Sequence, residues 1–138
     1  MQAHPSKTAG YWGRDLQAAS KSTPETAVDI DTTAFNAIWS LSPNQILRRK
    51  CPDCLETHQD IYYRRFDTNG LPSGFDLLDL VKNNWWSDPI ISDNTFNEDF
   101  KLYSNYSDAL ADSNAWTFCN FNDPLIGFPR DCGPTGYV

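Results

Sequence analysis

Two cysteines and a histidine lie close together in the segment 51–58 (Cys-Pro-Asp-Cys-Leu-Glu-Thr-His). The two-residue spacing between Cys51 and Cys54 is that of thiol-disulfide oxidoreductases, in which a helix N-terminus lowers the pKa of the first thiol. Such sites open a long helix, whereas here only a short polar link follows the pair. A carboxylate at Asp53 would also raise the pKa of a neighbouring thiol. The pattern therefore keeps a redox site only as an alternative.

The remaining cysteines, Cys119 and Cys132, extend the possibilities to metal binding or to two disulfides. Cys51, Cys54 and His58 could supply three ligands of a zinc site, but one of the distal cysteines would then stay free. We therefore predict that all four cysteines are oxidised and that at least one bond joins the 51/54 pair to the 119/132 pair. Closing so long a loop stabilises a fold by about 4 kcal/mol, whereas a bond within 51–54 constrains little.

Aromatic rings beside amides and carboxylates are the candidate binding residues. A pyranose presents an apolar face edged by hydroxyl groups, which suits a flat ring next to Asn and Asp side chains. Trp86 leads these candidates, because Trp85 completes the apolar face of a predicted helix and Trp86 is turned about 100° away from it. The alternative is that most of these rings form the core. The candidates are Trp86, Tyr63, Trp116, Asn120, Asn122 and Asp123.

Composition excludes several functional classes. The chain has 138 residues, about one domain, and a formal net charge of −7, so nucleic acid and anionic membranes are not expected partners. No apolar run is long enough to cross a membrane, which argues against direct insertion. The acidic segment 88–99 lacks the ligand spacing of an EF-hand, and no phosphate loop, dinucleotide fingerprint or nucleophile elbow is present. We therefore expect no metal, no cofactor and no enzyme activity.

The elements that must position these residues form a small α+β domain, with a mainly antiparallel sheet and short flanking helices. Asp31 or Thr32 can cap a helix whose apolar residues fall at one-turn spacing, namely Ala34, Phe35, Ile38 and Trp39. A second helix is expected over about 74–84, with Ser73 and Asp76 as a capping pair. Its buried face would hold Leu77, Leu78, Val81 and Trp85. Further expected elements are strands at 61–66, 100–103 and 116–121, and a helix over 108–113 capped by Ser107.

Residues 42–51 admit two interpretations. The segment 42–45 (Ser-Pro-Asn-Gln) has the cap, proline and glutamine of a helix start, which predicts a helical turn. Alternatively, residues 46–51 form a strand that pairs with 61–66, so that 56–60 becomes a hairpin loop. Both interpretations place Cys51 and Cys54 at the start of the loop.

Residues 1–33 have little periodicity and only scattered apolar side chains, which predicts an extended arm rather than a second core. The alternative is a disordered tail. We place the domain at 34–138. Because ordering an arm costs about 1 to 2 kcal/mol per residue, we expect it to be held by a surface outside the domain, such as a neighbouring copy of the chain. Deleting 1–33 should then leave a folded monomer that no longer assembles.

The segments 57–65 (Thr-His-Gln-Asp-Ile-Tyr-Tyr-Arg-Arg), 116–123 (Trp-Thr-Phe-Cys-Asn-Phe-Asn-Asp) and 127–134 (Gly-Phe-Pro-Arg-Asp-Cys-Gly-Pro) carry a resemblance. Over about residues 50–138 the chain resembles uncharacterised cysteine-containing modules of large extracellular proteins of algae and other microbes. The resemblance implies export and modular use, with further chain after Val138, and it implies no catalysis.

These observations favour a non-catalytic extracellular or cell-surface module that binds glycan or another protein subunit. The lone glycosylation acceptor, Asn105 in Asn-Tyr-Ser, agrees with export. The alternatives are a peripheral structural subunit of a larger complex, which includes membrane-bound complexes, and a thiol-disulfide oxidoreductase that uses Cys51 and Cys54.

Overall fold

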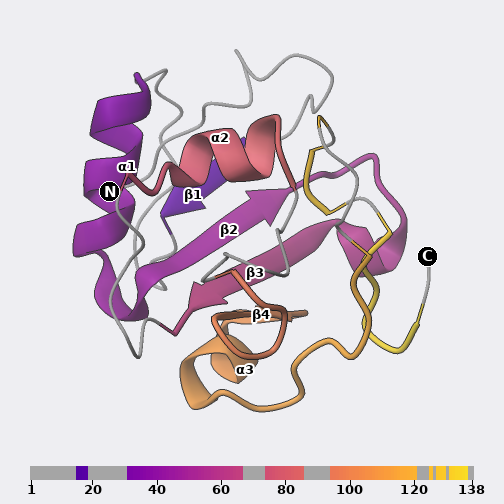
Figure 1. The fold of residues 1–138 in the computed structure, drawn as a ribbon. Helices are drawn as coiled ribbons and strands as arrows, with labels where there is room; N and C mark the ends of the chain where they lie inside the picture. The colour runs from indigo at the N-terminus through magenta and orange to yellow at the C-terminus, as the bar shows by residue number, and fades with distance from the viewer. Residues whose placement is uncertain are drawn as a thin grey trace.

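The computed structural model describes residues 15–18, 31–66, 74–85, 94–120, 125, 127–129 and 131–136. Four antiparallel strands form a sheet in the order β1-β2-β3-β4, and short helices flank it, which confirms the predicted α+β class (Figure 1). The elements are β1 (Asp15–Ala18), α1 (Thr32–Leu41), the 3-10 turn η3 (Pro43–Gln45), β2 (Ile46–Lys50), the 3-10 turn η4 (Glu56–His58), β3 (Asp60–Arg65), α2 (Leu77–Lys82), β4 (Phe100–Tyr103) and α3 (Tyr106–Ala111).

The central hairpin joins β2 to β3, with Leu47 opposite Tyr63 and Lys50 opposite Asp60. The strand interpretation is therefore confirmed over residues 46–50, with Cys51 just after the strand, and the preceding residues also make the short turn η3. That turn holds Asn44 at φ 58°, a left-handed conformation that asparagine tolerates better than most residues. The hairpin loop contains η4 and carries Cys51 and Cys54 at its start.

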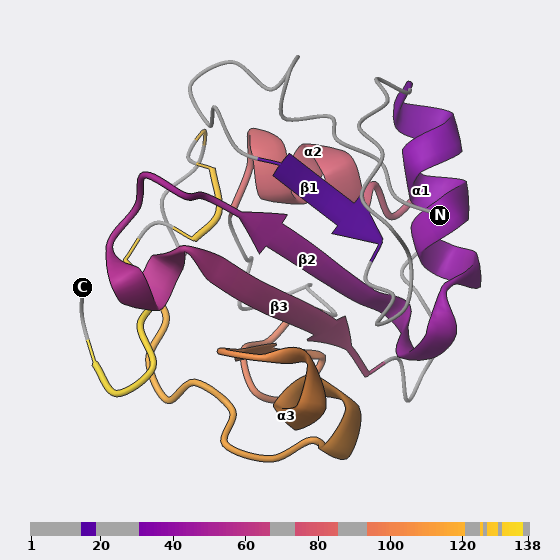
Figure 2. The ribbon, with the colours of Figure 1, turned by 180° about the vertical axis from the view of Figure 1, so that it is seen from behind.

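Side chains alternate between the two faces of the sheet, as the period of a strand requires. One face carries Leu47, Ile61, Tyr63 and Leu102 into the main core, which α1 and α2 cover. The opposite face contributes Ile46, Tyr62 and Tyr103 to a smaller cluster with Ala109 of α3. Figures 1 and 2 show α1 and α2 together on one side, with α3 beside the β4 end.

The helices begin at side-chain caps. Asp31 accepts a hydrogen bond from the Ala34 backbone nitrogen at 2.8 Å, and Phe35 and Trp39 are buried below it, as predicted. α2 buries the expected Leu77, Leu78 and Val81, and Trp85 is buried just after the helix ends. The helix is shorter than predicted because Asp76 caps its start and Asn83 its end. α3 starts earlier than predicted, because Asn105 rather than Ser107 accepts from the Asp108 backbone nitrogen.

The predicted strand at 116–121 is wrong for its described residues. Trp116 donates its backbone N–H to the Leu102 carbonyl at 2.7 Å, and Phe118 forms an isolated bridge with Gly133. The chain then turns away from β4, so apolar alternation in this segment reflects contacts with two different neighbours.

All four cysteines are oxidised, as predicted, but the predicted long-range bond is wrong. The bonds are Cys51–Cys54 and Cys119–Cys132. The reason is local geometry: the Cys54 backbone nitrogen donates to the Cys51 carbonyl across a tight turn, and the Phe118–Gly133 bridge brings Cys119 beside Cys132. The cysteines are therefore not ligands of the zinc site considered as an alternative.

The predicted arm also needs correction. β1 lies within residues 1–33, yet it pairs antiparallel with β2 of the same chain, with Asp15 opposite Lys50 and Ala18 opposite Leu47. A surface outside the domain is thus not what holds residues 15–18. The boundary at 33/34 also falls inside α1. The rest of the arm lies outside the described residues, apart from 31–33.

Candidate functional site

The predicted aromatic platform does not form from Tyr63 and Trp116. Tyr63 is fully buried and stacks on Phe100 with ring centroids 5.4 Å apart. Trp116 is also buried, and its Nε1 donates to Ser104 Oγ at 2.9 Å. Both rings therefore serve the core.

The other predicted binding residues do not restore the platform. Asn120 is half-buried. The residues Trp86, Asn122 and Asp123 lie outside the described residues.

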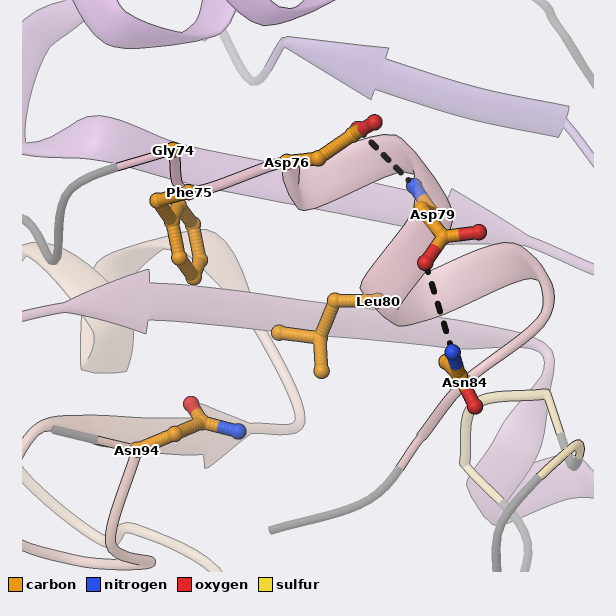
Figure 3. Close-up of a pocket in the computed structure, with 7 residues that line it drawn as sticks. All are labelled: Gly74, Phe75, Asp76, Asp79, Leu80, Asn84 and Asn94. Carbon is orange, nitrogen blue, oxygen red and sulfur yellow. Dashed lines mark hydrogen bonds between the residues drawn. The ribbon is translucent and has the colours of Figure 1, made fainter. Parts of the chain in front are cut away.

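A pocket lies instead beside α2, with a volume of about 280 Å³. Figure 3 shows Phe75 and Leu80 pointing into a shared space, with Asn94 across from the helix and Asp79 and Asn84 along its rim. The described lining residues are Gly74, Phe75, Asp76, Asp79, Leu80, Asn84 and Asn94. The pocket thus combines a flat ring and an aliphatic side chain with amides and carboxylates.

The ring of Phe75 is held in place by contacts with Arg65 and Trp39. The Arg65 guanidinium lies 4.4 Å from the ring centroid, and the Trp39 ring lies 5.9 Å away. Arg65 Nη1 also donates to Asn94 Oδ1 at 2.8 Å. One buried arginine on β3 therefore positions two of the lining side chains, so this part of the pocket is preformed.

The carboxylates on the rim are fixed by α2 itself. Asp76 Oδ1 accepts from the Asp79 backbone nitrogen at 3.1 Å and from Asn36 Nδ2 at 2.9 Å. Asp79 accepts from Asn83 Nδ2 at 3.0 Å and from Asn84 Nδ2 at 3.4 Å. Since carboxylate oxygens can each accept more than one hydrogen bond, both groups keep acceptor capacity for a ligand.

The lining offers binding groups rather than reactive groups. Among the described lining residues the ionisable groups are the carboxylates of Asp76 and Asp79, and no lining cysteine, histidine, serine or lysine is present. Both carboxylates are engaged by amide donors that hold the helix. The arrangement therefore suits a ligand with an apolar face and several hydroxyl groups.

The Cys51–Cys54 pair has a different environment from a redox site. Cys51 is fully buried and Cys54 is half-buried, with Arg49 Nη2 3.5 Å from Cys54 Sγ. A thiolate that attacks the reachable sulfur of Cys54 would expel the buried Cys51, whereas Arg49 is placed to stabilise Cys54. Only the short turn η4 follows the pair. This geometry favours a structural bond.

His58 connects the hairpin loop to the C-terminal segment. Its Nε2 lies 2.9 Å from the Cys132 carbonyl oxygen, its Nδ1 lies 2.8 Å from Thr57 Oγ1, and its ring packs on Trp116. Burial lowers the pKa of His58 below its ordinary value of 6.5; the hydrogen bond to Cys132 opposes this shift and the charge of Arg49 adds to it. The neutral imidazole is therefore the folded form's preferred state.

The free energy of unfolding is therefore expected to fall as the pH drops below 6.5. Because the folded pKa of His58 lies below 6.5, the unfolded chain binds more protons between these two values, so stability rises with pH there and is constant above it. Urea unfolding at pH 5 to 7.5 measures this slope. His58→Gln does not titrate and should flatten it; an equal slope in both proteins would assign the effect to other groups.

Of the residues that line the pocket, the sequence pointed to Asp76, which it predicted as a helix cap. Phe75 precedes that cap, so it does not belong to the buried face of α2, and its ring turns towards the pocket. Asn94 gave no signal, because its place opposite α2 depends on the hydrogen bond to Arg65 from a distant strand.

Comparisons with known proteins give no relatives for this chain: no family model, curated protein or solved structure matches it. In the part of the chain that the structure describes, no helix is long and apolar enough to cross a membrane.

Proposed function

We propose that this protein is a non-catalytic extracellular or cell-surface module that binds glycan in the pocket beside α2. The observation that supports the proposal is the combination of Phe75 and Leu80 with Asp76, Asp79 and Asn84 around one preformed space. A sugar ring can place its C–H face on the aromatic ring and its hydroxyl groups against the carboxylates and amides.

The size of the pocket suits one or two sugar units of a longer chain. Pockets that enclose drug-sized ligands have volumes of about 300 to 1,000 Å³, and this one measures about 280 Å³. The remaining units would lie on the surface outside the pocket. In this mode of binding the Phe75 ring contacts the sugar inside the pocket, while the carboxylate and amide oxygens on the rim accept hydrogen bonds from its hydroxyl groups.

Export is supported by the two disulfides, which form and persist in oxidising compartments. Asn105 is exposed, and it caps α3 through Oδ1 while Nδ2 donates to Asp108 Oδ2 at 3.0 Å. Since Nδ2 carries two hydrogens, a glycan on this nitrogen leaves the cap intact. We expect secretion from a eukaryotic host to add a glycan mass that Asn105→Gln removes; an unchanged wild-type mass would refute glycosylation.

Replacing Phe75 with alanine is expected to weaken glycan binding at least tenfold. Alanine removes both the stacking contact and the apolar area that the ring would bury against the sugar. For aromatic pairs stacking alone is worth about 0.5 to 1.5 kcal/mol beyond area burial, and 1.4 kcal/mol corresponds to a factor of ten. The measurement is a two-dimensional NMR titration with neutral oligosaccharides that include cellotetraose and β-1,4-mannotetraose. Wild-type shifts should centre on the pocket residues, and Phe75→Leu should lose most of the affinity while keeping apolar volume.

Phe66→Ala is the matched control for this titration. Phe66 is also half-buried and also carries an arginine over its ring, with Arg64 4.5 Å from the centroid, but it does not line the pocket. Its removal should leave the affinity unchanged. If no oligosaccharide shifts a pocket residue of the wild type, glycan binding at this site is refuted.

A further inference from the structure

We infer that the pocket selects uncharged sugar units over uronate or sulfated units, and that the carboxylate of Asp76 enforces this choice. The inference rests on the proposed glycan function and names the class of glycan. It follows from the charges around the pocket, because hydrogen bonding alone would accept either class.

The two rim carboxylates are satisfied by hydrogen bonds, and no cation among the described lining residues neutralises them. In the described part of the chain, Asp76 and Asp79 accept from backbone and asparagine nitrogens, all of which are neutral. Two acidic side chains elsewhere are, in contrast, paired with cations: Arg48 lies 2.7 Å from Asp60, and Lys101 lies 2.9 Å from Asp112. The pocket rim therefore keeps negative charge that those sites do not.

Among the described residues, Arg65 contacts two of the lining side chains, and it is not itself a lining residue. Its guanidinium lies on the Phe75 ring and bonds Asn94 Oδ1 and the Tyr63 hydroxyl, at 4.4, 2.8 and 3.2 Å, respectively. The Arg65 side chain is buried and already oriented by these groups. It therefore holds the lining side chains in place rather than donating its guanidinium N–H groups to an anionic ligand. A ligand carboxylate would therefore meet two carboxylates and no cation among the described lining residues.

The repulsion is large enough to measure. For two like unit charges a few ångströms apart near a protein surface, the repulsion energy lies between its value in water and its value at an effective dielectric constant of about 20. We therefore expect each rim carboxylate to weaken the binding of an anionic sugar unit about tenfold. Salt should reduce this penalty, because partly exposed charges are screened. Figure 3 shows both carboxylates on the α2 side of the pocket.

Asp76→Asn removes one of these charges with little structural change. Asparagine caps a helix as well as aspartate does, and its Oδ1 can keep both hydrogen bonds that Asp76 Oδ1 accepts. The matched control is Asp31→Asn, which makes the same substitution at the cap of α1, where Oδ1 accepts from Ala34. Asp31 does not line the pocket.

The test compares each neutral oligosaccharide that binds with the counterpart carrying a carboxylate at C6: cellotetraose with tetraglucuronate, and mannotetraose with tetramannuronate. The wild type and Asp31→Asn should bind the neutral chain at least tenfold more tightly at low salt. Asp76→Asn should reduce that ratio about tenfold; because the ratio is taken within one protein, any change in the neutral affinity itself does not enter the comparison. Equal wild-type affinities, or an unchanged ratio in Asp76→Asn, would overturn the inference and leave glycan binding standing. Absence of all binding would instead refute the proposed function, and the inference with it.

Discussion

Replacing Trp85 with alanine is expected to lower the free energy of unfolding by about 3 to 5 kcal/mol, out of the roughly 5 to 15 that stabilise a typical domain. Trp85 is fully buried where α2 meets the C-terminal segment. Its ring contacts Phe128 at 4.7 Å and Phe100 at 5.2 Å between centroids, and its Nε1 lies 3.4 Å from Cys132 Sγ. Alanine would leave a cavity among aromatic rings that cannot collapse. Urea denaturation followed by far-ultraviolet circular dichroism measures the loss.

Leu41→Ala provides the control for this measurement. Leu41 ends α1 and is 86% exposed, so its truncation should change the free energy of unfolding by less than about 0.5 kcal/mol. Trp85→Phe should fall between the two, because it keeps a ring but loses the indole N–H. A Trp85→Ala protein as stable as Leu41→Ala would mean that Trp85 does not anchor the core. Trp86→Ala, in contrast, is expected to weaken binding with little loss of stability; Trp86 lies outside the described part of the chain, so this stays a prediction.

Helices and one strand were readable because their patterns are local. Asp31 and the one-turn spacing of Phe35 and Trp39 define α1 without reference to the rest of the chain. The same holds for the buried face of α2, and for β4, whose bounds match the predicted 100–103. A periodic apolar face specifies which side must be covered, so such elements are predictable even when their partners are unknown.

The binding residues were less readable, because sequence does not distinguish a buried ring from an exposed one. Tyr63 alternates correctly as a strand residue, but the face it shares with Leu47 is the one that α1 and α2 cover. Nothing in the sequence marks Phe75 as a binding residue, yet its place directly before the cap of α2 leaves it half-buried at the pocket. Exposure depends on how helices stack on the sheet, which spacing within one element does not contain.

The cysteine pairing failed for a related reason. Loop entropy favours the long closure between 51/54 and 119/132, but that argument ranks bonds only among geometries that the folded chain permits. The turn after β2 places the Cα atoms of Cys51 and Cys54 5.4 Å apart. Phe118, in the segment after α3, forms a bridge with Gly133, which places Cys119 beside Cys132. The backbone hydrogen bonds of the fold therefore determine which cysteines are close enough to pair, and loop entropy does not change this choice. The two halves are joined instead by His58, which meets the Cys132 carbonyl.

Removing the Cys119–Cys132 bond is expected to cost about 3 kcal/mol, and removing Cys51–Cys54 about 2 kcal/mol. The order follows from loop length, since the bonded residues are 13 and 3 apart, respectively, and loop-closure entropy rises with the logarithm of loop size. The comparison uses two double variants, Cys119→Ala with Cys132→Ala and Cys51→Ala with Cys54→Ala. Urea denaturation of both is referred to the oxidised wild type.

The places of the two disulfides in the fold should increase the difference between the two stability losses. Cys132 is fully buried within the main core, where its sulfur lies beside Trp85 Nε1 and its carbonyl beside His58. Loss of the Cys119 bond frees the segment that carries these contacts, so protease cleavage between 119 and 136 should accelerate in that variant alone. Cys54 is half-buried in a hairpin loop whose strands stay paired through the β2–β3 register. A greater loss from the Cys51–Cys54 variant would show that this loop, and not the C-terminal segment, limits the stability of the fold.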